Sequence, residues 1–380
     1  MRFLHTSDWH LGRIFHGLHM TDDQAVVLEE LITLAKDSQV DAVLIAGDIY
    51  DRAVPPTQAV TLLDEVLRRL VQDAGKNVIM IAGNHDNADR LGFGQSLLSQ
   101  NKLYITGPVS AATQPVVLYD EHGPVYFAPL TYGEPLAASE LLGEPLKTHE
   151  DVVRRQIRSQ LEQIPAAARK VALAHVFLTG AQESPDSERP LAIGGATTVG
   201  IDCFAPFHYA ALGHLHACQS GSSKVRYSGS LLKYSFNEVA QPKGVHLVDL
   251  AADGSITVET IPLSPRRELA CLRGSFAELV SHPQTALHDH YLQVTLTDDQ
   301  PVLDAKYRLE QVYPHILHLE YARLHAGTDT SAAAVSHKKL GTAELFEAFF
   351  TQVNDRPLNA AEKSLLSDVI NSDVQAERQA

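Results

Sequence analysis

The 380-residue sequence has little cysteine and no long apolar run. Its three cysteines (Cys203, Cys218 and Cys271) cannot all pair and lack the spacing of metal ligands, so a disulfide-built scaffold is not expected and a reducing cytoplasm is the simpler location. No apolar run approaches the ~18 residues that a membrane-spanning helix needs. The opening segment MRFLHTSD becomes polar too early for a signal peptide. We therefore expect a cytoplasmic protein with no membrane partner.

An excess of positive charge is also missing. The chain has 31 Lys and Arg residues against 46 Asp and Glu residues, and its net charge of −15 argues against coating nucleic acid by bulk electrostatics. An enzyme that grips phosphates locally is not excluded, because divalent metals can supply the positive charge. The hydrophobic fraction of 44% is typical of a globular protein, and the length suffices for two or three domains.

The first two thirds of the chain read as a domain of strands and helices, residues 1–263. Buried strands are predicted at 2–6, 42–46 and 78–82, and they alternate with helices at 23–38, 57–74 and 88–100. This alternation predicts βαβ units and a parallel sheet covered by helices. Later strands are predicted at 116–118, 125–127, 171–175, 209–212, 226–228, 245–250 and 256–261, with a helix at 150–164 and a surface loop at 179–200. We expect them to form a second sheet packed on the first.

Smaller units follow this domain. The segment Ser264-Pro265-Arg266-Arg267 reads as a boundary, and 264–325 reads as an α+β module with strands at 269–272, 291–297 and 316–321 and helices at 276–281 and 302–313. Residues 326–341 read as a linker. Two helices with apolar stripes at helical spacing are predicted in 342–380. Their stripes could dock on this chain or in the groove of a partner, and the preceding linker favours a partner.

Polar clusters follow five predicted strands. They are Asp8-Trp9-His10, Gly47-Asp48-Ile49-Tyr50-Asp51-Arg52, Gly83-Asn84-His85-Asp86, His175, and Gly213-His214-Leu215-His216. Singly, each is more often a turn, a cap or a hydrogen-bonded structural residue. Together, they would bring carboxylates, an amide and imidazoles to one edge of the core, which is costly without a cation. The pattern therefore predicts a metal site.

The motifs D-x-H, GD-x-x-D, GNHD, a lone His and GHLH, in this order, resemble those of the calcineurin-like metallophosphoesterase family. The resemblance implies a four-layer αββα sandwich and a two-metal phosphodiesterase site. It places one metal on Asp8, His10, Asp48 and His216, and the other on Asp48, Asn84, His175 and His214. Mixed oxygen and nitrogen ligands favour Mn²⁺, with Mg²⁺, Fe or Zn²⁺ as alternatives.

The same resemblance assigns roles to residues beside the ligands. His85 would protonate or stabilise the leaving oxygen, and Asp51 would orient His85. Arg52 is a candidate phosphate contact, whereas Asp86 could simply cap a turn. Arg13, Arg90 and Ser230 are further candidate substrate contacts, and Arg226 and Lys233 are weaker ones, although most of these charges could equally be solvated.

Within the family, the sequence around these motifs, together with Tyr227-Ser228-Gly229-Ser230, is most similar to the SbcD group, the nuclease subunits of bacterial SbcC–SbcD complexes. That similarity is strong to about residue 250 and holds only in outline beyond it. It implies a nuclease with 3′–5′ exonuclease activity on duplex DNA and endonuclease activity on single strands and hairpins, acting in DNA repair, replication and recombination. The implied partners are DNA at the nucleoid, a second copy of the chain, and an SbcC-type coiled-coil ATPase bound through 342–380 in a heterotetramer.

Two features depart from this pattern, and two other functions stay open. Archaeal and eukaryotic relatives carry a histidine where this chain has Asp51, so their rules for choosing exonuclease or endonuclease cleavage should not be transferred. No basic stripe marks a DNA track. A small-molecule phosphodiesterase acting on a nucleotide or cyclic nucleotide would use the same metal site. A non-enzymatic scaffold would be expected to have lost ligands, and this chain retains the full set.

Overall fold

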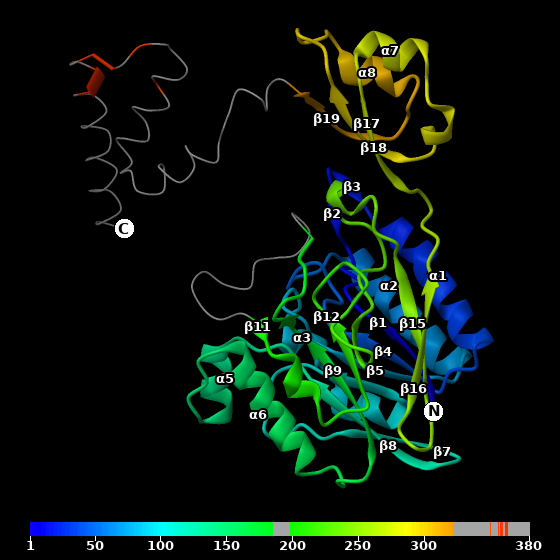
Figure 1. Cartoon of the computed structure of the whole chain (residues 1–380), viewed down its shortest axis with the longest axis vertical. Helices are drawn as coiled ribbons and strands as arrows, with labels where there is room; N and C mark the ends of the chain where they lie inside the picture. The colour runs from blue at the N-terminus through cyan, green and yellow to red at the C-terminus, as the bar shows by residue number, and fades with distance from the viewer. Residues whose placement is uncertain (185–197, 323–349, 351–355, 357, 360–361, 364–380) are drawn as a thin grey trace.

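The computed structural model describes residues 1–184 and 198–322, together with residues 350, 356, 358–359 and 362–363. Two six-stranded sheets lie face to face with helices outside them, which is the four-layer sandwich expected from the sequence (Figure 1). The first sheet has the order β16 (Ile256–Pro262), β15 (Gly244–Leu250), β1 (Arg2–Thr6), β4 (Ala42–Ala46), β5 (Asn77–Ile81) and β6 (Leu103–Thr106). The second has the order β13 (Gln219–Ser220), β14 (Val225–Tyr227), β12 (Tyr209–Gly213), β9 (Arg169–His175), β8 (Gly123–Leu130) and β7 (Val116–Asp120).

The central strands are apolar on both sides because each side faces a different layer. In β4, Ala42 and Leu44 pack between the two sheets, whereas Val43 and Ile45 pack toward the outer helices. The same alternation holds in β9, where Val171 faces the first sheet. Strands β1, β4, β5 and β6 are mutually parallel, as are β8, β9, β12 and β14. Parallel strands buried on both faces read as continuous apolar runs, which is why the sequence located them.

Helices cover the outer faces of both sheets. The first sheet is covered by α1 (Thr21–Asp37) and α2 (Thr57–Arg68), the latter continuing as the π-helical turn η1 (Arg69–Asp73). On the second sheet lie α6 (His149–Leu161), with α5 (Pro135–Leu142) beside it, and the 3₁₀ turn η3 (Ile201–Phe204) (Figure 1). Short strand pairs are formed by β2 (Ile14–Phe15) with β3 (Leu18–His19), and by β10 (Phe177–Leu178) with β11 (Thr198–Val199).

The single helix expected at 88–100 is wrong. The segment instead forms two short helices, α3 (Ala88–Leu91) and α4 (Gln95–Leu98), followed by the 3₁₀ turn η2 (Ser99–Asn101). The break follows from Gly94, whose φ of 74° lies in the left-handed region and ends any right-handed helix. The loop expected at 179–200 is described only in part, since 185–197 lie outside the described residues.

A smaller body follows residue 264 and lies beyond the β2–β3 end of the sandwich (Figure 1). It has a three-stranded sheet in the order β17 (Leu269–Gly274), β18 (Tyr291–Leu296) and β19 (Ile316–Tyr321), with its own apolar core. The connections carry α7 (Phe276–Ser281), the 3₁₀ turn η5 (Thr285–Leu287) and α8 (Ala305–Glu310). The strands are parallel and joined through helices, so the module is a βαβαβ unit. We call it the cap.

Polar contacts join the cap to the sandwich. The Tyr291 hydroxyl donates to the Asp23 carboxylate of α1, with oxygens 3.0 and 3.2 Å away. Lys233 Nζ lies 2.6 Å from Glu268 Oε2. The expected linker and most of the two expected terminal helices lie outside the described residues. None of the helices that the structure describes is both long and apolar enough to cross a bilayer.

The ion pair between Asp120 and Arg169 yields a stability prediction. Both side chains are about nine-tenths buried, and the two carboxylate–guanidinium bonds measure 2.6 and 2.8 Å. Replacing Asp120→Ala leaves the buried Arg169 guanidinium with only the Gly123 carbonyl as acceptor and also removes the partner of the Met1 ammonium, so it should lower the free energy of unfolding by about 3 kcal/mol. Urea denaturation at neutral pH measures this loss. The exposed neighbour offers a control, because Glu121→Ala should change stability by less than about 0.5 kcal/mol.

The Asp120–Arg169 pair should also make the stability of the fold depend on pH. The hydrogen bonds from Arg169 hold the pKa of Asp120 well below its usual range. A carboxylate with a depressed pKa stabilises the fold above the unfolded-state value of about 3.9 and loses that contribution as the pH falls toward the folded-state value. The difference between wild type and Asp120→Ala should therefore be full at neutral pH and shrink below about pH 4. A constant difference down to the lowest pH at which the protein folds would contradict this account.

Candidate metal centre

The predicted ligands converge where the carboxyl ends of strands from both sheets meet. The loops after β1, β4 and β5 come from the first sheet, whereas His175 ends β9 and the His214 loop follows β12 in the second. Backbone hydrogen bonds link the loops, since Asp8 N donates to Gly47 O at 3.1 Å and His10 N donates to Asp48 O at 3.0 Å. Six of the predicted ligand residues are buried to at least 98%: Asp8, His10, Asp48, His175, His214 and His216. Asn84 is partly buried beside them.

Asp48 lies at the centre of this cluster. Its Oδ1 accepts the backbone N–H of His85 at 2.8 Å, and its Oδ2 lies 3.4 Å from His175 Nε2 and 3.7 Å from His10 Nε2. Burial acts to raise the pKa of Asp48, but the surrounding imidazoles, His175 first, outweigh burial and hold the pKa well below its ordinary value. In turn, burial would lower the pKa of His175, yet Asp48 raises it to about 9. The buried Asp48 carboxylate is therefore stabilised only with positive charge beside it.

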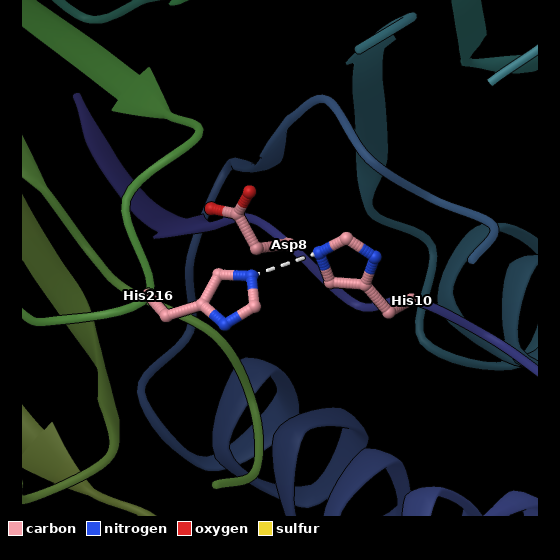
Figure 2. A group of neighbouring side chains, drawn as sticks. All are labelled: Asp8, His10 and His216. Atoms are coloured by element: carbon pink, nitrogen blue, oxygen red, sulfur yellow. Dashed lines mark hydrogen bonds between the residues drawn. The ribbon is translucent and has the colours of Figure 1, made fainter. Parts of the chain in front are cut away.

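One ligand group contains Asp8, His10 and His216, whose donor atoms lie within 4.8 Å of one another (Figure 2). His216 Nε2 is only 3.0 Å from His10 Nε2. Two ring nitrogens at that distance repel each other unless a proton or a cation lies between them. Burial raises the pKa of Asp8 to about 6, and its carboxylate accepts the His214 N–H at 3.0 Å and the Ser7 hydroxyl at 2.5 Å.

The other predicted ligand set is also brought together. Asn84 Oδ1 lies 2.8 Å from His175 Nε2 and 3.1 Å from His214 Nδ1, and Asp48 borders the same space. Within the described part of the chain, His214 Nε2 is buried with no hydrogen-bond partner. Burial also lowers the pKa of His214 to about 3, so its ring is neutral and has a lone pair to offer. These properties are those of metal ligands.

Hydrogen bonds outside the cluster fix which ring nitrogen faces it. His175 Nδ1 lies 2.9 Å from the Ala46 carbonyl, and His216 Nδ1 lies 3.1 Å from Glu238 Oε1. Because a carbonyl and a carboxylate only accept, each Nδ1 carries a proton and it is Nε2 that faces the cluster, where it would offer its lone pair once a metal displaces any proton from it. The donor set of carboxylates, an amide oxygen and imidazoles therefore fits divalent metal, and Asp48 Oδ2 lies near the rings of both His10 and His175.

The backbone of the site is strained where the ligands project. Four non-glycine residues at the site have positive φ: Asp8 (52°), His10 (47°), Asp48 (50°) and His214 (107°). Such conformations cost energy and concentrate at functional sites. Two motif glycines allow close approach as well. A Cβ at Gly83 would lie 2.2 Å from Asp48 Oδ1, and one at Gly213 would lie 2.0 Å from the Ala46 carbonyl oxygen. Glycine is therefore sterically required directly before Asn84 and directly before His214.

Glu238 is a site residue that the motifs missed. It belongs to the 3₁₀ turn η4 (Phe236–Glu238) and is fully buried, with Lys243 Nζ 2.5 Å from Oε2 and His216 Nδ1 3.1 Å from Oε1. Burial would raise the pKa of Glu238, but His216 and Lys243 lower it to about 2. The carboxylate is therefore ionised and holds His216 in one tautomer. A lone Glu in a loop carries no spacing signal, which is why the sequence did not reveal it.

His85 lies at the edge of the cluster, with Nε2 4.0 Å from Asp48 Oδ2. Its Nδ1 lies 2.8 Å from the main-chain carbonyl of Asp51, so contact with Asp51 exists but not through the carboxylate. That carboxylate instead accepts from Arg13 Nη1 at 2.9 Å. Asp86 does more than cap one turn, because it accepts the backbone N–H groups of Ile49, Tyr50 and Gly83 and so ties two ligand loops together.

The candidate substrate contacts differ in their exposure to solvent and in their partners within the protein. Arg13 and Arg52 lie beside Asp51 at the rim of the site, and the Arg52 side chain is about half exposed. Arg90 is exposed on α3. The expectation for Ser230 is corrected, because its side chain is fully buried and its hydroxyl donates to the Leu232 carbonyl and accepts from Lys243 Nζ.

The two weaker candidates also have contacts within the protein. Lys233 is held by the ion pair with Glu268. Arg226 bonds to Ser220 Oγ and to the Ser223 carbonyl. Both side chains are therefore engaged by groups of this chain.

Comparison with known families agrees with this geometry. The family model of the calcineurin-like phosphoesterases matches residues 1–217, more than half of the chain, and the chain belongs to this family. Family membership and the clustered ligands indicate a metal-dependent phosphoester hydrolase. A second model, SbcD_C, described as the type 5 capsule protein repressor C-terminal domain, matches residues 265–354. The two matches together support the likeness to SbcD-type nuclease subunits.

Solved structures with similar folds are distant in sequence. TT1561 of Thermus thermophilus is 16% identical, with a TM-score of 0.41 over 68% of this chain and 98% of that chain. A dimetal phosphatase from Danio rerio is 12% identical, with a TM-score of 0.38 over 68% of this chain and 95% of that chain. GAP50 of Plasmodium, described as the anchor in the inner membrane complex, is 13% identical, with a TM-score of 0.35 over 84% of this chain and 96% of that chain.

The contact between Glu238 and His216 yields a prediction on metal affinity. Removing the carboxylate frees the His216 ring to rotate, so Glu238→Ala should weaken Mn²⁺ binding by about 10- to 100-fold. Glu238→Gln keeps an acceptor oxygen and should lose less. Isothermal titration calorimetry with Mn²⁺ measures both, and the exposed Glu259→Ala on β16 serves as control. Wild-type affinity in a folded Glu238→Ala protein would show that Glu238 does not position the ligand.

Proposed function

We propose that this protein is a Mn²⁺-dependent DNA nuclease that cuts duplex ends as a 3′–5′ exonuclease and single strands and hairpins as an endonuclease. The observation that supports the proposal is a cluster of buried acidic and histidine side chains in a chain that matches the calcineurin-like phosphoesterase model at 1–217 and the SbcD_C model at 265–354. Its role would be in DNA repair, replication and recombination. We also propose the division into a nuclease domain at 1–263, a DNA-positioning cap at 264–325, a linker at 326–341 and a partner-binding segment at 342–380.

The proposed metal assignment follows the two ligand groups. Asp8, His10, Asp48 and His216 would hold one ion, and Asp48, Asn84, His175 and His214 the other. Divalent ions held there would lower the pKa of a bound water and would offset the charge that develops on the transferring phosphoryl group. Buried, prepositioned ligands keep the carboxylates ready for this task, because the strained backbone holds them in place before substrate arrives.

Chain residues outside the ligand set would perform the remaining steps. The Asp51 carbonyl keeps the proton on His85 Nδ1, so the other nitrogen, Nε2, points toward the metal-binding cluster. When protonated, Nε2 can donate its proton to the leaving oxygen. Arg52 is exposed at the rim and can contact a phosphate on either side of the scissile bond. The side chain of Asp51 holds Arg13 at the same rim.

A partner completes the proposal. The chain lacks a Gly-rich Lys motif for binding nucleotide phosphates, so ATP hydrolysis would come from an SbcC-type coiled-coil ATPase bound through 342–380. Two copies of each subunit would form the complex. The net charge of −15 fits this arrangement, because DNA would be held largely by the partner and locally by the metal centre.

The net charge also favours a second candidate, a phosphodiesterase for nucleotides or cyclic nucleotides, which needs no DNA track. The two functions differ in what they ask of the C-terminal segment. Removing residues 342–380 should leave hydrolysis of a small diester unchanged under either function. The truncation should abolish stimulation of DNA cleavage by the ATPase only if the nuclease proposal holds.

The test compares wild type with His85→Gln in Mn²⁺-dependent cleavage of end-labelled single-stranded and hairpin DNA. Loss of a general acid should slow DNA cleavage by about 10²- to 10⁴-fold. Mn²⁺ affinity should be unchanged, because His85 is not in either ligand set. A small nucleotide diester runs in parallel, and the ATPase with ATP is added to half of the reactions. If only the small diester were hydrolysed and the ATPase had no effect on its rate, the nuclease proposal would be rejected. The proposed metal site would not be affected by that result.

A further inference from the structure

A groove of about 510 Å³ lies between the sandwich and the cap, next to the metal centre. Arg13, His16, Tyr234 and Phe236 line it from the sandwich, and His318 of β19 lines it from the cap. Its volume is within the range of sites that hold small organic groups, about 300–1,000 Å³. The groove is separate from the ligand set of the metals.

Aromatic and imidazole rings follow one another along this groove. The rings of Phe15 and Phe236 are 5.1 Å apart, and Phe236 is 5.4 Å from His16. His16 in turn lies 4.9 Å from His318 at an interplanar angle of 33°. His16 is exposed and has a left-handed φ of 46°, so the β2–β3 turn projects it from the sandwich toward the cap. The result is a row of rings that crosses from one body to the other, in which Phe15 and Phe236 are buried and His16 and His318 are accessible.

The groove also connects directly to the reaction centre. The Tyr234 ring packs edge-on against His10, one of the metal ligands, at 5.6 Å. The Arg13 guanidinium lies 5.7 Å from the centre of the same Tyr234 ring and is bonded to Asp51 at the rim of the metal site. A phosphodiester held at the metal centre therefore has a cation and a row of rings on one side.

Charge along the groove suits a neutral flat group better than a phosphate. Partial burial, together with His318, lowers the pKa of His16, so its ring is mainly neutral at neutral pH. Arg13 lies at the end nearest the metals, where its charge is offset by the Asp51 carboxylate. Outside the groove, the cap is joined to the sandwich where Tyr291 bonds to Asp23 and Lys233 pairs with Glu268.

We propose that this groove is a base-stacking subsite, in which an unpaired nucleobase adjacent to the cleaved phosphate stacks on the ring of His16, with Phe236 and His318 supporting that ring. The inference rests on the proposed nuclease function and specifies its substrate as a single, unstacked strand. Stacking of bases on side-chain rings beside a backbone-binding cation is a general mode of single-strand recognition. Bases in an intact duplex have no free face, so the subsite selects frayed ends, hairpin loops and single strands.

The test measures the binding of wild type and three variants to two strands. The full chain with Mn²⁺ is titrated with a short single strand that has cleavage-resistant phosphorothioate linkages, and with the same strand in which every base is removed. Fluorescence anisotropy gives the Kd for wild type and His16→Ala. His318→Ala provides a second, independent variant from the cap. The matched control is His122→Ala, which removes a comparably exposed histidine from the β7–β8 turn.

The expected result is a loss of affinity confined to strands with bases. His16→Ala should weaken binding of the base-containing strand by about 5- to 100-fold, the range for loss of one stacked base. Binding of the abasic strand should change by less than twofold, and His318→Ala should show the same selectivity with a smaller loss. Equal losses on both strands, or no loss on either, would overturn the subsite. If wild type bound neither strand, the nuclease proposal itself would fail, which is a different outcome from an unselective variant.

Discussion

The site is organised around the buried carboxylate of Asp48. Four contacts converge on it: the His85 N–H and the rings of His175, His10 and His85. A carboxylate so deeply buried is tolerable only with compensating positive charge. The loops from both sheets must therefore meet at a fixed distance. That requirement accounts for the parallel strands that deliver the loops, for the left-handed backbone at Asp48, and for the absence of a Cβ at Gly83, which would collide with Asp48.

Much of this arrangement could be predicted from the sequence because its signals are local. Continuous apolar runs such as 42–46 and 171–175 marked strands buried on both faces, and polar motifs at their ends marked the edge where ligands meet. The predicted ligands come from five strand ends in two sheets, yet the order of strands did not have to be known. The prediction needed only the rule that parallel strands have their carboxyl ends at one edge of a sheet. Asp48 and His175 are neighbours there, although 127 positions separate them in the sequence.

What the sequence could not predict depends on contacts between segments without a motif. Glu238 reaches His216 from a 3₁₀ turn, and Gln24 of α1 donates to the carbonyls of Trp9 and His10, but neither residue has a pattern that distinguishes it. The break in the helix expected at 88–100 depended on one glycine adopting positive φ. The contact between Asp51 and His85 runs through the main chain, whose direction no residue type encodes. Each of these features is set by tertiary geometry.

The central claim, that Asp48 is shared by two metal ions, is tested most directly by crystallography on the Mn²⁺-loaded protein. Anomalous difference maps locate each Mn²⁺ independently of any assumption about ligands. The account predicts two peaks about 3.5–4 Å apart on either side of the Asp48 carboxylate. One should lie beside His10 and His216, and the other beside Asn84 and His175. A single peak, or two peaks that do not share Asp48, would contradict the account.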